Sequence, residues 1–338
     1  MAGVSVADVD ESVLSKAGYV YPAMHRDNMF VKTGTYTAEI KVFIRNTWDW
    51  LSVEFKKSDI DYILHHCGSR SECVPTLQKK GKEWFLVFGF EEIISLRNLD
   101  NNISNTVALA VDLGINRAAT CSAMRSDGTV IGRRTLKLPR EEDCLKHALN
   151  RIKKAQQHGA RKMPRLWARA TGISDDIAVK TANFIMDTAR QYDCDVIVFE
   201  HLDTKGKKRG SGKQRLHHWR CQYVQKMVMS KAHREGMHVS TICAWGTSRL
   251  AYDGSGPVQR GSKAELSTYS LCKFSNGKVY DCDLSATYNI GARYFIREIL
   301  KSLPETARLD ISAKVPECSK RSTCTYSSLI SLNAVFAA

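Results

Sequence analysis

The sequence has 338 residues, of which 50 are Lys or Arg and 35 are Asp or Glu, so the net charge is +15 and the isoelectric point is near 9.3. A chain of this length can form two domains that each have a core. The excess positive charge attracts polyanions, which makes nucleic acid the expected partner. A soluble basic protein without such a partner is the plain alternative.

The sequence has no feature of a membrane or secreted protein. No run approaches the ~18 apolar residues that a membrane span requires, and the start MAGVSVADVDESV lacks the basic-then-apolar order of a secretory signal. The 11 cysteines follow no repeated spacing, which favours reduced thiols over a disulfide framework. We therefore expect a cytoplasmic protein with no membrane partner.

The first part of the chain has the composition of β-strands. Residues 34–58 and 83–91 are rich in β-branched and aromatic residues, and clusters of Gly, Ser and Lys separate them. They predict a small antiparallel β-domain within residues 1–104. The apolar run VALAVDLGI begins at Val107, and two further strand-like segments follow across the turn Ser126-Asp127-Gly128. Three successive strands joined by short turns are expected there.

Helices and strands alternate after these three strands. Apolar residues at helical spacing predict several helices, of which the first is strongly basic, and short apolar runs predict buried strands. The last helix should end at Pro304. The expected segments are a basic helix at 145–170 followed by a second helix, a strand at 196–200, a helix at 215–235, a strand at 237–244, an irregular insertion at 246–280, a helix from Leu284 to Leu303, and a weakly ordered tail at 304–338.

Three carboxylates fall at the ends of these expected elements. Asp112 lies in the first strand of the meander, Glu200 closes the strand VIVFE, and Asp283 stands where the last helix begins. A buried carboxylate costs several kcal/mol unless a cation, a proton or a hydrogen-bond donor compensates its charge. Carboxylate oxygens suit Mg²⁺ or Mn²⁺, and two such ions can activate water and stabilise the leaving oxygen in phosphodiester cleavage.

Each carboxylate alone also has a plain explanation. An Asp followed by x-Gly after a strand opens the phosphate-binding hairpin of actin-like ATPases, Glu200 could form a salt bridge at a strand end, and Asp283 could cap its helix. The order is more specific. A strand-borne Asp in a three-stranded meander, then a helix, a strand-borne Glu and a helix-borne Asp predict an α/β fold of the RNase H-like class over residues 105–303, with a nuclease site.

Three stretches resemble the RuvC motifs of a known family. AVDLGINRAAT is similar to the first motif, VIVFEHL to the second and DCDLSATYNIGARYF to the third motif of the TnpB proteins of insertion sequences and of their descendants, the type V CRISPR effector nucleases. The resemblance covers roughly residues 105–298, and the N-terminal part more loosely resembles the family's wedge domain. It implies that Asp112, Glu200 and Asp283 are the catalytic and metal-binding residues. Asp281 is not chosen, because the family's Asp directly precedes the stretch that matches Leu284-Ser285-Ala286-Thr287-Tyr288-Asn289-Ile290.

The resemblance also implies the partners, a guide RNA and a target DNA in a prokaryotic cytoplasm. In the family, the regions that correspond to the basic helical insertion at about 140–190 and to residues 205–220 line the channel for both. Lys and Arg would contact phosphates, and Trp219 could stack on a base; the alternative is a solvated basic loop with a packed Trp219. The candidate contacts are Arg151, Lys153, Lys154, Arg161, Lys162, Arg165, Arg169, Lys205, Lys207, Lys208, Arg209, Lys213, Arg215 and Trp219.

The sequence departs from the family at two places. The family's zinc ribbon has two CxxC pairs, but the segment LAYDGSG has no cysteine and only Cys272 remains of the second pair. Because tetrahedral zinc needs about four N or S ligands and Cys272 and Cys282 supply two at most, we expect no zinc. Only about a hundred residues precede the first motif, which is short for a wedge domain with a full recognition lobe and puts recognition of the target duplex in doubt.

The function that the sequence predicts is an RNA-guided DNA endonuclease with one RuvC-type site and two divalent metal ions. The alternative is a guide-RNA-dependent or nonspecific DNA-binding regulator with little cleavage. An actin-like ATPase is a third hypothesis. The sequence argues against it, because it has no second Asp-x-Gly phosphate loop. The oligomeric state is not predicted.

Overall fold

The computed structural model describes residues 22–80, 83–97, 99, 103–202, 219–320 and 322–337. The chain divides into two compact units, Met1–Ile93 and Ile94–Ala338. No helix in these described ranges is long and apolar enough to cross a membrane.

The first unit is a small β-rich unit, as the sequence predicted. Its antiparallel sheet has the order β1-β2-β3, and Arg45 and Asn46 both have positive φ at the tight turn between β2 and β3. Two short antiparallel pairs, β4 with β7 and β5 with β6, and a helix that the sequence did not predict complete it. The elements are β1 (Phe30–Lys32), β2 (Thr37–Ile44), β3 (Thr47–Glu54), α2 (Lys57–Cys67), β4 (Ser71–Glu72), β5 (Thr76–Lys80), β6 (Glu83–Val87) and β7 (Phe90–Glu91).

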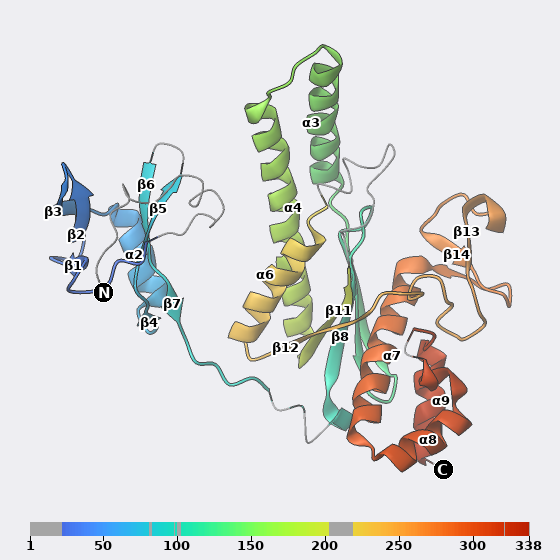
Figure 1. Ribbon diagram of the computed structural model, residues 1–338. Coiled ribbons are helices and arrows are strands. Elements are labelled where there is room, and N and C mark those ends of the chain that lie inside the picture. Colours follow the sequence, from blue (N-terminus) through green and yellow to red (C-terminus); the bar gives the residue numbers. More distant parts are fainter. Residues whose placement is uncertain are drawn as a thin grey trace. The chain divides into compact units, whose positions relative to one another are not determined.

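The second unit is built on a five-stranded sheet of order β10-β9-β8-β11-β12 (Figure 1). The first three strands along the chain form an antiparallel meander, and β11 and β12 then add parallel to β8. This is the RNase H-like arrangement that the sequence predicted. The elements are η2 (Ile103–Asn105), β8 (Val107–Asp112), β9 (Ala119–Arg125), β10 (Val130–Leu136), β11 (Val196–His201) and β12 (His238–Cys243).

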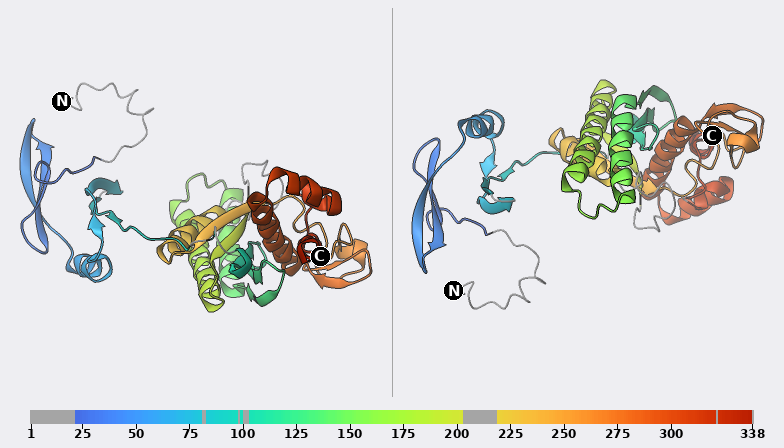
Figure 2. Two further views of the ribbon diagram at one scale, coloured as in Figure 1. Left: turned by 90° about the horizontal axis from the view of Figure 1, so that it is seen from below. Right: turned by 90° about the horizontal axis from the view of Figure 1, so that it is seen from above.

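Two helices, α4 (Pro164–Gln191) and α6 (Cys221–Arg234), lie on one face of this sheet, and α3 (Pro139–Gln157) packs against α4. The single basic helix expected at 145–170 is therefore two helices, which lie side by side (Figures 1 and 2). The break has a local cause. Gly159 adopts φ +84°, which glycine tolerates, and Pro164 starts the next helix at a position where its missing N–H costs nothing.

Helix α7 (Cys282–Ser302) lies on the opposite face. Alternate residues of a strand point to opposite faces, and the two cores follow this rule. Leu109, Val111, Ile197 and Phe199 pack in the core with α4 and α6, whereas Ala108, Ala110, Val196 and Val198 pack in the core with α7. By the same alternation Asp112 and Glu200 point to the α7 face.

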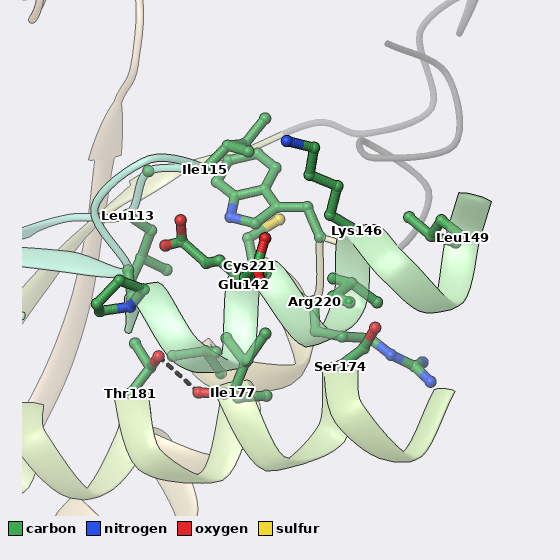
Figure 3. A pocket seen from close by; sticks show the side chains of 18 of the residues that line it. Leu113, Ile115, Glu142, Lys146, Leu149, Ser174, Ile177, Thr181, Arg220 and Cys221 are labelled. Carbon is green, nitrogen blue, oxygen red and sulfur yellow. Dashed lines mark hydrogen bonds between the residues drawn. The ribbon is translucent and has the colours of Figure 1, made fainter. Parts of the chain in front are cut away.

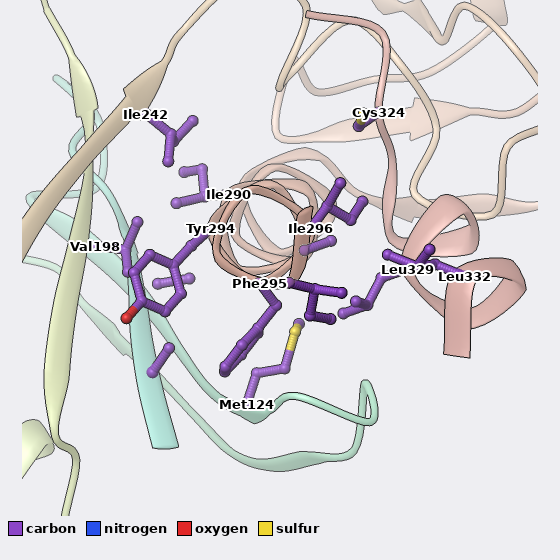
Figure 4. Packing of buried hydrophobic residues seen from close by; sticks show 14 of the residues in the cluster. Met124, Val198, Ile242, Ile290, Tyr294, Phe295, Ile296, Cys324, Leu329 and Leu332 are labelled. Atoms are coloured by element: carbon purple, nitrogen blue, oxygen red, sulfur yellow. The ribbon is translucent and has the colours of Figure 1, made fainter. Parts of the chain in front are cut away.

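The segment after α7 differs from the weakly ordered tail that the sequence predicted. It forms α8 (Glu305–Lys314), η4 (Pro316–Ser319) and α9 (Tyr326–Ala337), and Leu329 and Leu332 of α9 are completely buried against α7 (Figure 4). Burial of such a side chain contributes about 1.5–3 kcal/mol. The sequence is Ser-rich, but its apolar residues cover the face of α7 that the sheet leaves open.

The insertion at 246–280 is also more regular than expected. It contains β13 (Gln259–Arg260), η3 (Gly261–Ala264), β14 (Leu271–Lys273) and β15 (Val279–Asp281), and the three strands form an antiparallel sheet. Cys272 and Cys282 are buried together with Ala251 and Phe274 in a small core. Packing and strand pairing therefore hold this segment, and the expectation that it binds no zinc rests on the sequence.

Candidate active site

The three predicted carboxylates come from neighbouring elements of the second unit. Asp112 ends β8, Glu200 is in β11, and Asp283 is in the first turn of α7. Val111 pairs with Phe199 in the parallel ladder, so Asp112 and Glu200 are each one residue further along adjacent strands. The fold therefore brings Asp112 and Glu200 to the same end and the same face of the sheet, where α7 begins.

The start of α7 shows which of its two acidic residues caps the helix. Asp281 is the N-cap, because its Oδ1 accepts hydrogen bonds from the backbone N–H groups of Asp283 (3.1 Å) and Leu284 (3.0 Å). Asp283 therefore does not cap the helix, and its carboxylate is not used for capping. Its side chain remains one third exposed, so it can reach both the site and solvent.

The electrostatics of the site reflect an excess of negative charge. Burial raises the pKa of Asp112 well above its ordinary value, and the nearby carboxylates of Glu200 and Asp283 raise it further. Burial also raises the pKa of Glu200 and of Asp283. Because Glu200 and Asp283 raise the pKa of Asp112, their carboxylates lie close enough to repel it, and a bound cation would relieve this repulsion.

Two arginines that the sequence did not single out offset part of this charge. Arg117 Nη1 lies 2.6 Å from Asp281 Oδ2 and 3.3 Å from Asp283 Oδ2. Arg260, in β13, lowers the pKa of both Asp112 and Asp283 by its positive charge. Arg117 follows Asp112 by five residues in the β8–β9 turn, which is the only sequence signal for it; nothing in the sequence indicates Arg260.

The residues present fit a divalent cation by their chemistry. The carboxylates are hard oxygen donors, and the buried hydroxyl of Thr120, the residue paired with Asp112, has no hydrogen-bond partner among the described residues. No group of three or more His, Cys, Asp or Glu side chains in the described ranges forms a ready-made metal site. The site thus has the ligand types and the charge for a metal, in an arrangement where Arg117 contacts Asp283.

The seven basic candidates on the α3–α4 hairpin are all exposed. Three lie on α3, where they line a shallow hollow with His147 and Asn150, and the others lie between the helices and at the start of α4. Their side chains are available to an anionic partner. These residues are Arg151, Lys153, Lys154, Arg161, Lys162, Arg165 and Arg169. The other basic candidates, Lys205, Lys207, Lys208, Arg209, Lys213 and Arg215, lie outside the described residues.

Trp219 is half-buried and packs against the core on the α4–α6 face. It also lines a pocket of about 600 Å³ between α3, α4, α6 and the loop after β8, together with Leu113, Ile115, Glu142 and Lys146 (Figure 3). Trp219 thus packs in this core and stays partly exposed to the pocket, and its stacking on a base stays a prediction. Because Leu113 and Asp112 point to opposite faces, the pocket and the carboxylates lie on opposite sides of the sheet.

Comparisons with known proteins bear on the family. No family model matches the chain. The chain is 24% identical over 239 residues to a TnpB-like protein of Aquifex aeolicus (strain VF5). The aligned region covers 63% of this chain and 74% of that protein.

Solved structures of low identity were also matched. A Cas12f1–sgRNA–target DNA complex is 12% identical with a TM-score of 0.44, covering 80% of this chain and 68% of the other. C2c1 of Alicyclobacillus acidoterrestris is 11% identical with a TM-score of 0.49, covering 79% and 54%, so this chain spans about half of its length. RuvC of Thermus thermophilus is 9% identical with a TM-score of 0.27, covering 69% and 97%. The chain is therefore similar in sequence to a TnpB-like protein, and its central sheet has the RNase H-like strand order.

Proposed function

We propose that this chain is an RNA-guided DNA endonuclease with a single RuvC-type, metal-dependent site. The observation that carries the proposal is the placement of Asp112, Glu200 and Asp283 at one end of the α7 face, where each carboxylate has a raised pKa. Buried carboxylates that repel one another are unfavourable without a cation and are therefore typical of a functional site.

Asp112, Glu200 and Asp283 would hold the divalent cations, Mg²⁺ or Mn²⁺. Two bound ions supply an activated water and stabilise the leaving oxygen during phosphodiester hydrolysis. The chain's own side chains prepare the site. Arg117 balances the charge of Asp283 through an ion pair, and the Thr247 hydroxyl donates a hydrogen bond to Glu200.

The choice of partners rests on the relation to a TnpB-like protein and on the charge of the chain. The chain is 24% identical to a TnpB-like protein, and its resemblance to that family implies a guide RNA and a target DNA. The α3–α4 hairpin carries seven exposed basic residues. Such side chains bind phosphates of RNA or DNA without reading sequence. A guide RNA would then supply the sequence specificity by base pairing.

One observation favours a second candidate function, a guide-dependent or nonspecific DNA-binding regulator with little cleavage. Arg117 lies 3.3 Å from Asp283, and no ready-made metal site occurs among the described residues. A site in which an arginine permanently replaced the metal would bind nucleic acid without cutting it.

The test is cleavage by the purified protein with its co-purified RNA. A plasmid that matches this RNA is incubated with the complex in Mg²⁺, beside Asp112→Ala and the control Asp310→Ala, an exposed residue of α8. We expect wild type and the control to cut the plasmid and Asp112→Ala to leave it intact. Binding of the plasmid without cleavage by wild type would reject the endonuclease and support the regulator.

A further inference from the structure

The carboxylate of Glu200 is held by a residue outside the predicted site. The Thr247 hydroxyl donates a hydrogen bond to Glu200 Oε1, and Thr247 is only 1% exposed. This hydrogen bond lowers the pKa of Glu200 against the effect of its burial. Since burial removes water as a competing partner, one fixed donor can select the orientation of the carboxylate.

The backbone around Thr247 is fixed in turn by Asn289 of α7. The completely buried Asn289 side-chain N–H₂ donates to the carbonyls of Thr247 and Leu250, both at 2.9 Å, and its carbonyl accepts from the backbone N–H of Tyr326 at 3.0 Å. Three of the four hydrogen bonds that an Asn side chain commonly makes are therefore used. The loop cannot move away from Glu200 unless this arrangement breaks.

Arg293, one helical turn after Asn289, holds the beginning of the same loop. Its guanidinium donates to the carbonyls of Cys243 (2.9 Å) and Trp245 (2.8 Å), and also to Cys324 (2.9 Å) in the C-terminal segment. Arg293 is buried and its charge attracts Glu200. Residues 243–250 are thus attached to α7 at both ends, and the Thr247 hydroxyl is the point where this attachment reaches the site.

We propose that Thr247 is a positioning residue of the carboxylate site: its hydroxyl holds Glu200 in the orientation that a divalent cation requires. The proposal rests on the proposed function in one respect, that Glu200 is a metal ligand. A residue that orients a ligand by a hydrogen bond contributes about 10–100-fold to metal affinity or activity. Thr247 also donates to the carbonyl of Ala244 at 3.0 Å, so a purely local role in the turn is the competing explanation.

The experiment compares variants of Thr247 by their Mn²⁺ dissociation constant, their rate of target cleavage and their thermal stability. Thr247→Val keeps the shape without the hydroxyl, Thr247→Ala removes it with no added bulk, and Thr247→Ser restores it. The matched control is Ser248→Ala, an exposed neighbour. We expect Val and Ala to weaken Mn²⁺ binding about 10–100-fold, Ser to restore it to within a few-fold, and the control to leave it unchanged.

The positioning role is overturned if folded Thr247→Val and Thr247→Ala bind Mn²⁺ as wild type does, or if Thr247→Ser is as weak as Thr247→Val, which would indicate packing. Failure of the proposed function gives a different result. Wild type would then bind Mn²⁺ and lose this binding on Thr247→Val, but cut no matching target.

Discussion

Buried polar side chains on the two faces of the central sheet have different kinds of hydrogen-bond partner. On the α4–α6 face, the hydroxyls of Ser174, Thr181 and Thr188 donate to carbonyls one turn earlier in their own helix. On the α7 face, Asn289 and Arg293 donate to carbonyls 42 and 50 residues away in the chain. The hydrogen bonds on the α4–α6 face form as soon as the helix forms, whereas those on the α7 face form only when the whole unit is assembled.

This difference explains where the site lies. Carboxylates that must keep a fixed geometry need a rigid surrounding, and long-range hydrogen bonds on the α7 face supply it. The α4–α6 side carries the exposed basic hairpin, where exact placement of each side chain matters less for binding phosphates. Substitutions on the two faces should therefore affect different measured properties.

The largest effect is expected at the start of α7. Asp283→Asn removes a proposed metal ligand and should lower target cleavage by at least about 10³-fold, a loss of roughly 4 kcal/mol of transition-state stabilisation. Asp281→Asn keeps a side chain that can cap the helix and should lose far less activity. Single-turnover cleavage rates measure both. Equal losses would show that Asp281 and Asp283 have been assigned the wrong roles.

A second large effect concerns the C-terminal helix that completes the α7 face. Leu332 is fully buried against α7, so Leu332→Ala should cost about 2–5 kcal/mol of unfolding free energy. Phe336→Ala, at a side chain that is 49% exposed, is the control and should cost much less. Urea unfolding of both variants measures the difference. If both cost the same, α9 does not pack on α7 as described.

The basic hairpin on the other side should show a moderate effect of another kind. Replacing Arg151, Lys153 and Lys154 by Gln removes up to three phosphate contacts and should lower the slope of log K against log salt by about 2–3. The fold and Mn²⁺ binding should not change, because all three residues are exposed on α3. Lys314→Gln on α8 is the control. An unchanged slope in the triple variant would exclude this face from the interface.

The smallest effect is on the pH dependence of stability without metal. Because the folded state raises the pKa of Asp112, chiefly by burial and then through Glu200 and Asp283, its stabilising contribution is complete below the ordinary pKa of about 4 and is lost as pH rises through the raised pKa. Asp112→Asn should therefore raise the melting temperature at neutral pH, by about 2–4 °C for each kcal/mol. Melting curves from pH 4 to 8 test this, and an unchanged slope in Asp112→Asn would contradict it.

The sequence predicted the parts of the fold that depend on local pattern. The apolar runs around Asp112 and Glu200 identified β8 and β11, and the order of the elements identified the RNase H-like class. It did not predict the break between α3 and α4 or the helices of the C-terminal segment. The serines of this segment indicate a tail, whereas Leu329 and Leu332 lie three residues apart on one helix face that packs against α7. The surface of α7 that they cover cannot be read from the local pattern.

The candidate site was predicted less completely than the fold. The three carboxylates were named from their order, but Arg117, Arg260 and Thr247 reach the site only through turns and through the insertion, and long-range contacts of this kind leave no periodic signal. Asp281 was set aside as a ligand, and the structure gives it a different role as the helix cap.

The proposed function requires that Asp112, Glu200 and Asp283 together bind divalent metal. The most direct test is Mn²⁺ titration of wild type and Asp112→Asn, followed by electron paramagnetic resonance of the free ion. We expect saturable binding by wild type that is lost or greatly weakened in Asp112→Asn while the variant stays folded. Equal binding by the two proteins, or none by wild type, would contradict it.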